Sequence, residues 1–486
     1  MPRKQMGDVI VMLPGITGSV LQKDGKDVWA PTGGAVIGAL LSLGKNIKSL
    51  ALKDDPPDVD DLGDGVVATR VMPDIHLIPG LWKIDGYSKL KNYVMKTFDV
   101  KLGDNLFEFA YDWRRDNRVS ARKLQRSAND WLKAWRESSG NKDAKLILVG
   151  HSMGGIISRY YLECLDGWRD TRTLVTFGTP YRGSLKAIGT LSNGMEKKIG
   201  PIGLDLTAMA RSFTAIYQLL PVYPCVETDG GLVRVAETDI PNVDRQRAAS
   251  AREFHEEIRL AVEKHEQDDE YLKGRYDIRP VIGTFQPTAQ SAKAHGGGVQ
   301  LIKSYEGEDI GGDGTVPRVS ATPIEIEHEE NAMFAAQRHA SLQNDDPVLA
   351  QLAGILSGLH LDLAAFRPLP TVGLSLDVED VYETGEPVTI KARPERESTD
   401  ALLAVVEDAS RPPDSEQPVE LARAPLRPAE DGWHSVEIPP LPDGAYRVTV
   451  LGSGMVEPVA DVFAVVSAAA VERGAEERSL AGVTDA

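Results

Sequence analysis

The chain has 486 residues, of which 42% are hydrophobic and 26% are charged, and its formal net charge is −18. This length exceeds one ordinary domain of roughly 100 to 200 residues, so we expect one large and one smaller domain. The composition is that of a folded protein, and no apolar run approaches the roughly 18 residues that a membrane-spanning helix needs. The negative charge argues against a nucleic-acid partner, because phosphate backbones bind positively charged surfaces.

The negative charge is concentrated near the C-terminus, where 10 Lys and Arg stand against 23 Asp and Glu from Arg367 onward. The N-terminus enters an apolar run at Val9, which leaves no room for the core of a signal peptide and predicts a cytoplasmic protein. Cys164 and Cys225 are too few and too far apart for a disulfide framework or a metal cluster. We therefore expect two incidental thiols, no metal and no cofactor.

Short apolar runs alternate with helical patterns through the first 366 residues. The runs lie at residues 8–13, 105–111, 145–149, 172–177, 278–285 and 324–327. Such alternation is typical of a parallel sheet that helices cover on both faces. Residues 185–276 interrupt the pattern with mixed sequence, including a helical stretch at 251–266. Long insertions are usually functional, so we predict a cap or lid there.

The character of the chain changes after a predicted helix at 347–359 and a Pro-rich hinge at 367–370. Six short β-type runs separated by turn residues then follow, between about residues 372 and 467. Regular spacing of short strands predicts a small β-sandwich over 371–468, of the immunoglobulin or fibronectin type III kind. Residues 469–486 are predicted to form a flexible tail.

Ser152 lies in the run Gly150, His151, Ser152, Met153, Gly154, after the apolar run at 145–149 and before a helical segment at 155–165. This context is that of a nucleophile elbow, in which two glycines permit a sharp turn that projects the serine hydroxyl above the sheet. It predicts an α/β-hydrolase fold over residues 1–366. The alternative, a packed turn serine, is less favoured because strand and helix are both correctly placed.

A serine nucleophile needs a base and an orienting carboxylate, and in this fold the chain order is Ser, then acid, then His. Asp313 is flanked by Gly312 and Gly314 and follows a candidate strand at 299–305, so we predict it as the acid. The alternatives are a plain turn, since Asp and Gly are common turn residues, or Asp309 as the acid.

Three histidines follow Asp313: His328, His339 and His360. His339 lies between the last predicted strand and the last predicted helix, in the loop from which a base reaches the serine, and we predict it as the base. His328 is the second choice. His328 and His360 end a strand-like run and a helix, which favours structural or solvated positions for both.

The tetrahedral oxyanion of acyl transfer needs preorganised donors, usually backbone amides. We predict the amide of Met153, directly after the nucleophile, and the amide of Thr17 in the glycine-containing loop at 14–21. The amide of Ile16 is the neighbouring alternative.

Several short motifs together resemble the lecithin:cholesterol acyltransferase family across about residues 8–359. Beyond the elbow, they are Leu13, Pro14, Gly15 with Gly18 and Leu21; Tyr111, Asp112, Trp113, Arg114; Phe177, Gly178, Thr179, Pro180 with Gly183 and Ser184; and Asp313 with Thr315, Val316 and His339. The resemblance implies an α/β-hydrolase with a mobile lid that acts on acyl lipids as a phospholipase or acyltransferase. It carries the triad to Ser152, Asp313 and His339, and the oxyanion donors to Met153 and Thr17.

The secreted family members have a signal peptide and disulfides, and we expect neither in this chain. The β-sandwich lies outside the resemblance. The Tyr111 to Arg114 stretch carries over as a signature only, since a packed Trp and an ion-paired Arg would account for it. The prediction is therefore a serine-dependent lipid acyl-ester hydrolase or O-acyltransferase. The alternatives are a small-molecule carboxylesterase and a partner-gated effector whose sandwich binds a protein.

Two apolar segments are candidates for peripheral membrane contact. The run at 36–44, which includes Leu40, is too short to span a bilayer and predicts either an interfacial helix or core packing. The segment at 217–224, with Leu219 and Tyr223, predicts either a second interfacial surface or the lining of an acyl pocket.

Overall fold

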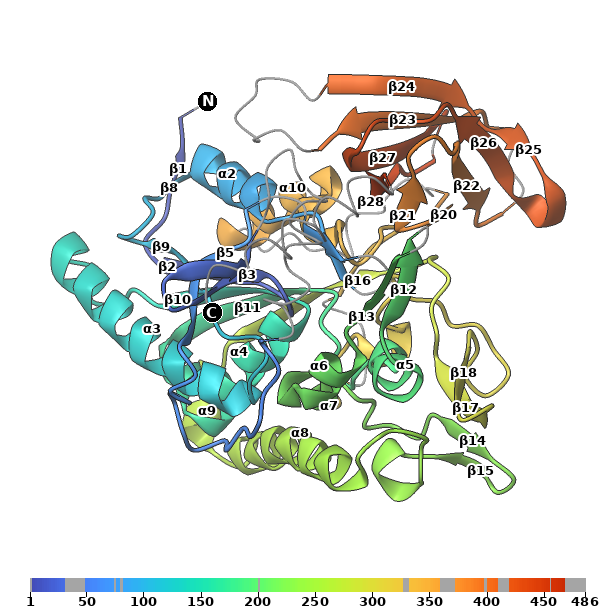
Figure 1. Cartoon of the computed structure of the whole chain (residues 1–486). Coiled ribbons are helices and arrows are strands. Elements are labelled where there is room, and N and C mark those ends of the chain that lie inside the picture. The colour runs from blue at the N-terminus through green and yellow to red at the C-terminus, as the bar shows by residue number, and fades with distance from the viewer. Residues whose placement is uncertain are drawn as a thin grey trace, which may run out of the picture.

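The computed structural model describes residues 2–30, 49–73, 76–78, 82–199, 202–326, 332–358, 372–396, 400–409, 419–454 and 456–467. Several predicted features lie outside these ranges: the apolar run at 36–44, His328, His360, the hinge at 367–370 and the tail at 469–486. Figure 1 shows the described elements in chain order.

A six-stranded sheet forms the centre of the first region, and all of its described strand pairs are parallel. Its spatial order is β19 (Met333–Ala335), β16 (Asp277–Gly283), β11 (Thr171–Phe177), β10 (Leu146–His151), β2 (Val9–Leu13) and β9 (Leu106–Glu108). The chain order reverses at β2, because β9 lies on one side of it and β10 on the other. Open parallel sheets bind ligands outside the carboxyl ends of the strands at such a switch point.

Alternate residues of the central strands enter two different apolar cores. In β2, Val9, Val11 and Leu13 join one core, whereas Ile10 and Met12 join the other. Helices α3 (Asn117–Ser139) and α4 (Met153–Cys164) pack in the first core, and α2 (Ser88–Thr97) and α10 (Asp346–Leu356) pack in the second. Figure 1 shows the two helix pairs on opposite sides of the sheet. The predicted α/β class with a covered parallel sheet is confirmed.

The prediction of a last strand at residues 324–327 is wrong. Residues 324 and 325 lie in a turn, Ile324 is exposed, and Glu325 forms an ion pair with Arg159 of α4. The alternation of Ile and Glu is typical of a half-buried strand and led to this prediction. In the structure, the Glu325 carboxylate pairs with Arg159, and the segment forms a turn. The last strand of the sheet is β19, which pairs with β16.

The predicted cap contains the helices α5 (Leu185–Asn193), α6 (Thr207–Ser212), α7 (Thr214–Gln218), α8 (Arg245–His265) and α9 (Asp269–Gly274). It also contains a hairpin, β12 (Glu196–Ile199) with β13 (Ile202–Asp205). A four-stranded sheet joins β15 (Gly231–Val233) and β14 (Val226–Thr228) to β17 (Ser291–His295) and β18 (Gly298–Ile302). The predicted end at residue 276 is therefore wrong, because strands on both sides of β16 build one small sheet.

Further short strands surround the start of the parallel sheet. They are β1 (Lys4–Gln5) with β8 (Phe98–Asp99); β3 (Ser19–Lys23) with β4 (Lys26–Trp29) and β5 (Val66–Val71); and β6 (His76–Ile78) with β7 (Trp82–Ile84). Within the described ranges, no helix combines the length and apolarity that a bilayer crossing requires.

Residues 372–467, here called the β domain, form two sheets around one core. One sheet has the order β20 (Leu374–Val378), β22 (Val388–Pro394), β26 (His434–Ile438) and β25 (Arg427–Pro428). The other has the order β21 (Val381–Glu383), β28 (Val459–Val466), β27 (Gly444–Gly452), β23 (Leu402–Asp408) and β24 (Val419–Pro425). Side chains from both sheets, such as Ile390 and Phe463, share the core. Likeness to immunoglobulin or fibronectin modules stays a prediction.

Candidate active site

Ser152 stands at the sharp turn between β10 and α4. Its backbone has a φ of 52°, in the left-handed region that non-glycine residues rarely occupy. The Ser152 amide donates to the carbonyl of Phe177 at 2.8 Å, and the Thr179 hydroxyl donates to the Ser152 carbonyl at 3.0 Å. These contacts with the end of β11 hold the turn in its unusual conformation.

Position 154 of the elbow requires a glycine because the backbone at residues 13 and 14 lies very close to it. A Cβ at Gly154 would lie 2.6 Å from the carbonyl oxygen of Pro14 and 2.7 Å from that of Leu13. Because these are backbone atoms of the loop after β2, they cannot move aside cheaply. The absence of a side chain therefore lets the start of α4 pack against the predicted oxyanion loop.

The structure brings Ser152, His339 and Asp313 together. His339 Nε2 lies 3.1 Å from Ser152 Oγ, and His339 Nδ1 lies 2.7 Å from Asp313 Oδ2. The other oxygen of the Asp313 carboxylate accepts from the amides of Thr315 at 2.9 Å and Val316 at 2.7 Å. This arrangement suits a neutral imidazole that donates to Asp313 and accepts the hydroxyl proton of Ser152.

Gly178 is the second position where a side chain would disrupt the site. A Cβ there would lie 2.7 Å from Asp313 Oδ2 and 2.8 Å from His339 Nδ1. Gly178 also has a φ of 53°. The carboxylate and the imidazole can therefore meet only because a glycine directly follows β11.

The candidate strand before Asp313 does not belong to the parallel sheet. The predicted strand at 299–305 corresponds to β18, which belongs to the small mixed sheet of β15, β14, β17 and β18. Asp313 instead forms a bridge with Gln286, in the segment that follows β16. The alternative acid Asp309 is exposed and binds the Gln290 side chain and the Gly311 amide, so its carboxylate is engaged away from His339.

Sequence reasoning missed two residues that connect the oxyanion loop to the base. The Gly15 amide donates to the Tyr87 hydroxyl oxygen at 2.8 Å, and this hydroxyl lies 2.7 Å from His151 Nδ1. His151 Nε2 lies 3.1 Å from the carbonyl oxygen of His339, to which it can only donate. No periodicity or motif links Tyr87 to His151, because the contact depends on how distant loops meet above the sheet.

His151 is neutral in this network. Burial lowers the pKa of His151 to about 3, and the nearby imidazole of His339 adds to the effect. A neutral His151 that accepts from Tyr87 and donates to the His339 carbonyl satisfies both of its ring nitrogens. It therefore holds the main chain of the base without adding a charge beside it.

The two candidate oxyanion amides of the first loop are placed differently. Ile16 lines the same cavity as Ser152, whereas the Thr17 side chain is fully buried and its φ is 64°. The Thr17 carbonyl accepts from the Trp29 indole at 3.0 Å. Met153 begins α4 directly after Ser152, two residues before the predicted start of the helix. The oxyanion amides of Met153 and of Thr17, with Ile16 as the alternative, stay predictions.

The cavity beside Ser152 has a volume of about 170 Å³. Apolar side chains from the cap, Ile216 and Leu219, form part of its wall. Tyr223 does not line it, and its hydroxyl donates to the Gln290 carbonyl at 3.2 Å. Leu219 and Tyr223 are both buried, so neither side chain forms an exposed interfacial surface in this structure.

The signature Tyr111 to Arg114 has a structural role in this arrangement. The Tyr111 hydroxyl donates to the Pro14 carbonyl at 2.7 Å, and the Trp113 indole donates to the Ser19 carbonyl at 3.0 Å. The buried Arg114 guanidinium pairs with Asp112 at 2.6 Å. These contacts fix both ends of the loop that contains Ile16.

The β domain contacts the loop that carries His339. Gln337 donates from Nε2 to the Pro458 carbonyl at 2.7 Å and accepts at Oε1 from the Ala460 amide at 3.1 Å. The side-chain amide of Gln337 thus makes one donated and one accepted hydrogen bond with the backbone at the start of β28, as a neighbouring strand would. The residue two positions before His339 is therefore held by the β domain.

Arg338, directly before His339, is held in the same way. Its Nε lies 2.9 Å from Oδ2 of Asp461, a carboxylate in β28 whose side chain is 0% exposed. The same oxygen lies 2.7 Å from the ammonium of Lys83. Two cations of the first region thus share one buried anion of the β domain.

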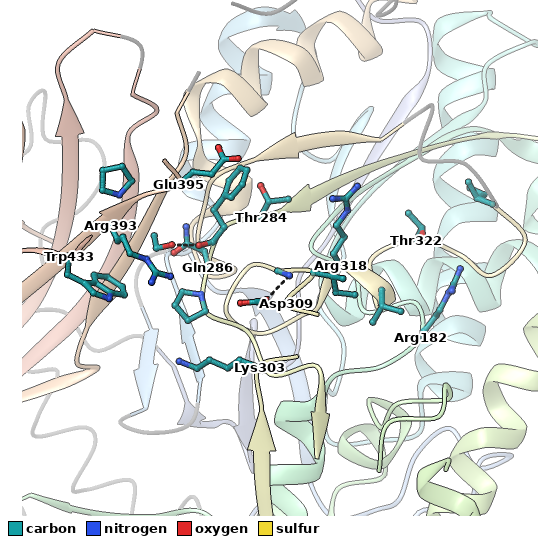
Figure 2. A pocket seen from close by; sticks show the side chains of 18 of the residues that line it. Arg182, Thr284, Gln286, Lys303, Asp309, Arg318, Thr322, Arg393, Glu395 and Trp433 are labelled. Atoms are coloured by element: carbon teal, nitrogen blue, oxygen red, sulfur yellow. Dashed lines mark hydrogen bonds between the residues drawn. The ribbon is translucent and has the colours of Figure 1, made fainter. Parts of the chain in front are cut away.

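A larger cleft of about 1580 Å³ lies between the loops of the first region and the β domain, and Figure 2 shows it from close by. Arg393 and Trp433 of the β domain lie on one side of it, and Arg318 and Arg182 of the first region lie on the other. Its lining includes Asp309 but none of Ser152, Asp313 and His339. The candidate reacting groups therefore lie outside this cleft.

The described residues contain no group of three His, Cys, Asp or Glu side chains arranged to hold a metal ion. Burial raises the pKa of the thiols of Cys164 and Cys225 to about 12. A thiol with a raised pKa is a poor nucleophile near neutral pH. Ser152 therefore remains the candidate nucleophile of the described structure.

The model of the lecithin:cholesterol acyltransferase family matches residues 80–272 of the chain. The resemblance to this family is confirmed. The matched segment contains Ser152 and most of the cap, and it ends before Asp313 and His339. It supports acyl-ester hydrolysis or acyl transfer as the general class of reaction.

The uncharacterized protein YJR098C of Saccharomyces cerevisiae is 26% identical to this chain over 176 residues, which are 36% of this chain and 23% of the yeast protein. The chain thus aligns with less than a quarter of that relative. Among solved structures, lipase BlEst2 of Bacillus licheniformis in its mature form is 14% identical, with a TM-score of 0.31 over 73% of this chain and 93% of the lipase.

Phospholipase PlaB from Legionella pneumophila is 9% identical, with a TM-score of 0.25 over 94% of this chain and 92% of the phospholipase. TM-scores this low carry no argument about fold or activity. The assignment of a reaction therefore depends on the family match and on the geometry around Ser152.

Proposed function

We propose that the chain is a serine-dependent acyl-ester hydrolase or O-acyltransferase that acts on lipids. The observation that supports this most directly is the 3.1 Å distance between Ser152 Oγ and His339 Nε2, with Asp313 bound to the other ring nitrogen. The family match over residues 80–272 supports a lipid ester as the substrate class. Membrane contact, a protein partner of the β domain and a cytoplasmic location remain predictions.

In the proposed first step, His339 Nε2 accepts the proton of Ser152 Oγ as this oxygen attacks the ester carbonyl. The tetrahedral oxyanion accepts from the amide of Met153 and from an amide of the first loop, at Ile16 or Thr17. Asp313 keeps the imidazole in the required tautomer and stabilises the imidazolium that forms. The carbon–oxygen bond to the alcohol then breaks, and His339 delivers the proton to the leaving oxygen.

The second step regenerates the enzyme from the acyl-Ser152 ester. His339 accepts a proton from an incoming hydroxyl, whose oxygen attacks the acyl carbonyl. The bond between the acyl carbon and Ser152 Oγ then breaks, and His339 returns the proton to Ser152 Oγ. A water molecule gives a free fatty acid, and an alcohol gives a new ester. The two outcomes use the same residues, so the acceptor is set by access to the cavity.

A small-molecule carboxylesterase is the second candidate function, and the size of the cavity favours it. A volume of about 170 Å³ is below the roughly 300 to 1,000 Å³ of ordinary ligand pockets. Such a cavity suits a short acyl chain. A series of para-nitrophenyl esters from butanoate to palmitate, together with phosphatidylcholine vesicles, would separate the two functions by chain length.

The proposal is tested with a fluorophosphonate probe, which reacts with activated serines. We expect labelling of the wild type and none of Ser152→Ala. Ser127→Ala, on α3 and outside the cavity, is the matched control and should label normally. Labelling that persists in Ser152→Ala would contradict the proposal.

A further inference from the structure

The cavity beside Ser152 has a charged wall as well as an apolar one. Lys83, Lys186, Arg338 and Asp380 line it together with the apolar side chains of the cap. An acyl chain alone makes no use of such charges, because charged groups lose hydration when they are covered by hydrocarbon. The charged wall therefore points to a polar part of the substrate.

Two of the three cations are neutralised by the β domain. Lys83 lies 2.8 Å from Asp380 and 2.7 Å from Asp461. Arg338 lies 2.9 Å from Asp461 and donates from Nη1 to the Leu376 carbonyl at 2.9 Å. The two carboxylates of the β domain are thus already used by Lys83 and Arg338.

The third cation, Lys186 in the first turn of α5, has no such partner. Its backbone amide is bound to the Ser184 hydroxyl at 3.2 Å, but its ammonium has no hydrogen bond or ion pair with any residue in the described ranges. Burial lowers the pKa of Lys186, whereas the charge of Asp380 opposes this effect. A half-buried ammonium without a partner is costly unless a ligand supplies an anion.

Three cations face two carboxylates of the β domain, Asp380 and Asp461, and the third carboxylate of the cavity, Asp313, is bound to His339 and to two backbone amides. The ammonium of Lys186 is therefore left without an ion pair in the same cavity as Ser152 and His339. In a site with few water molecules, an ammonium binds an oxyanion through a charge-assisted hydrogen bond, which is stronger than one between neutral groups.

We propose that Lys186 binds an anionic oxygen group of the substrate, a phosphate diester or a carboxylate, next to the acyl group that Ser152 attacks. The inference rests on the proposed function and makes it narrower: the enzyme prefers anionic esters to neutral esters of the same size. A phosphate diester would come from a lipid head group, and a carboxylate would come from the far end of a short acyl chain.

Two pairs of soluble substrates test the proposal and separate the two sources. One pair is dibutanoylphosphatidylmethanol and the neutral dibutanoylglycerol. The other is the para-nitrophenyl monoester of succinate, which carries a carboxylate, and para-nitrophenyl butanoate. For each pair the measured quantity is the ratio of kcat/KM for the anionic ester to that for the neutral ester.

We expect the wild type to favour the anionic ester in at least one pair and Lys186→Gln to lower that ratio about tenfold, as loss of a charge-assisted hydrogen bond implies. Lys186→Arg should restore most of the ratio, because it keeps the charge. Lys142→Gln, which removes an exposed lysine before β10, is the control for a general loss of charge and should leave the ratio as in the wild type. The pair whose ratio falls identifies the anion as a phosphate diester or a carboxylate.

An unchanged ratio in Lys186→Gln for both pairs, with normal turnover, would overturn the anion site and leave the proposed function intact. A wild-type preference for the neutral ester in both pairs would also overturn it, and this measurement needs no variant. If no ester is turned over in a Ser152-dependent way, the proposed function itself fails.

Discussion

The parallel-sheet region and the β domain both bury continuous apolar cores, but they expose polar groups in different ways. In the first region, the turn after β10, the loop after β19 and the segment that bridges to the end of β16 bring a serine, a histidine and a carboxylate within hydrogen-bond distance. The β domain has two sheets around one core and places its buried carboxylate, Asp461, against Arg338. The first region thus contains the candidate reacting groups, and the β domain binds the loop that carries one of them, His339.

This difference indicates why a second domain lies beside a catalytic sheet. The loop that carries His339 follows β19, a strand of three residues at the edge of the sheet. Such a short strand makes few hydrogen bonds with its neighbour, so it fixes the following loop weakly. Contacts from Gln337 and Arg338 to the β domain supply the missing constraint.

The largest expected effect is a loss of kcat on substitution of the candidate base in the first region. His339→Gln removes the base, so kcat for an ester should fall on the order of a millionfold, close to the loss in Ser152→Ala. The free energy of unfolding should change little, because His339 is half-buried at the cavity. Kinetics of ester hydrolysis together with urea unfolding check both statements. A variant that keeps more than a hundredth of wild-type activity would contradict the assignment of the base.

The next largest effect is expected in the β domain, at the contacts that hold the loop of His339. Asp461→Asn leaves the buried cations Lys83 and Arg338 without their shared anion, which should cost about 3 to 5 kcal/mol in the free energy of unfolding. The His339 loop would then shift, and a displacement of about 1 Å in a catalytic group can lower kcat about a hundredfold. Arg338→Gln should lower the free energy of unfolding less in the Asp461→Asn protein than in the wild type, since the two side chains interact.

The result that would contradict this account is a stable Asp461→Asn protein with wild-type kcat. The β domain would then be a neighbour of the active site without influence on its base.

A smaller effect concerns pH, to which the two regions should respond differently. Because burial lowers the pKa of His151 to about 3, the unfolded state binds a proton near pH 6.5 that the folded state does not bind. His151 therefore destabilises the fold as the pH falls from about 6.5 towards 3, by about 2 kcal/mol at pH 5. Its contribution is constant above pH 7.

Urea unfolding at pH 7 and pH 5 measures this change, and His151→Gln should show a shallower pH dependence than the wild type. His151 belongs to β10 of the first region, so the unfolding of the β domain should lack its contribution. Equal slopes for His151→Gln and the wild type would show that His151 is protonated in the folded protein.

Much of the candidate site could be predicted because it depends on local sequence. The elbow at Ser152 requires a strand, a turn with two glycines and a helix, and all three lie within about twenty residues. Asp313 and His339 followed from the chain order of the fold, and the structure places both against Ser152. The alternation of apolar runs with helical patterns is also a local feature of the sequence, and it predicted the parallel sheet.

The features that could not be predicted depend on contacts between distant segments. The sheet that joins β14 to β17 pairs residues more than sixty positions apart, so the cap boundary at 276 could not be read from composition. The roles of Tyr87 and His151 depend on how two loops meet. The partnership of Arg338 with Asp461 spans two domains, and a single charge in a sequence does not specify its partner.

The smallest expected effect provides the control for the β domain. Tyr382→Phe removes two hydrogen bonds within the β domain: the Tyr382 hydroxyl donates to the Thr389 carbonyl at 2.7 Å and accepts from the Glu379 amide at 3.1 Å. It should lower the free energy of unfolding by about 1 kcal/mol and leave kcat as in the wild type. A large loss of activity here would mean that general loosening of the β domain, rather than the Asp461 contact, controls the base.

The central claim is that the acyl group is carried by Ser152, and trapping the intermediate tests it most directly. Para-nitrophenyl butanoate is mixed with the protein, the reaction is quenched with acid, and the peptides are mapped by mass spectrometry. The account predicts one butanoyl group on the peptide that contains Ser152, formed with a burst of para-nitrophenolate. Turnover without a butanoylated peptide, or a butanoyl group on another residue, would contradict it.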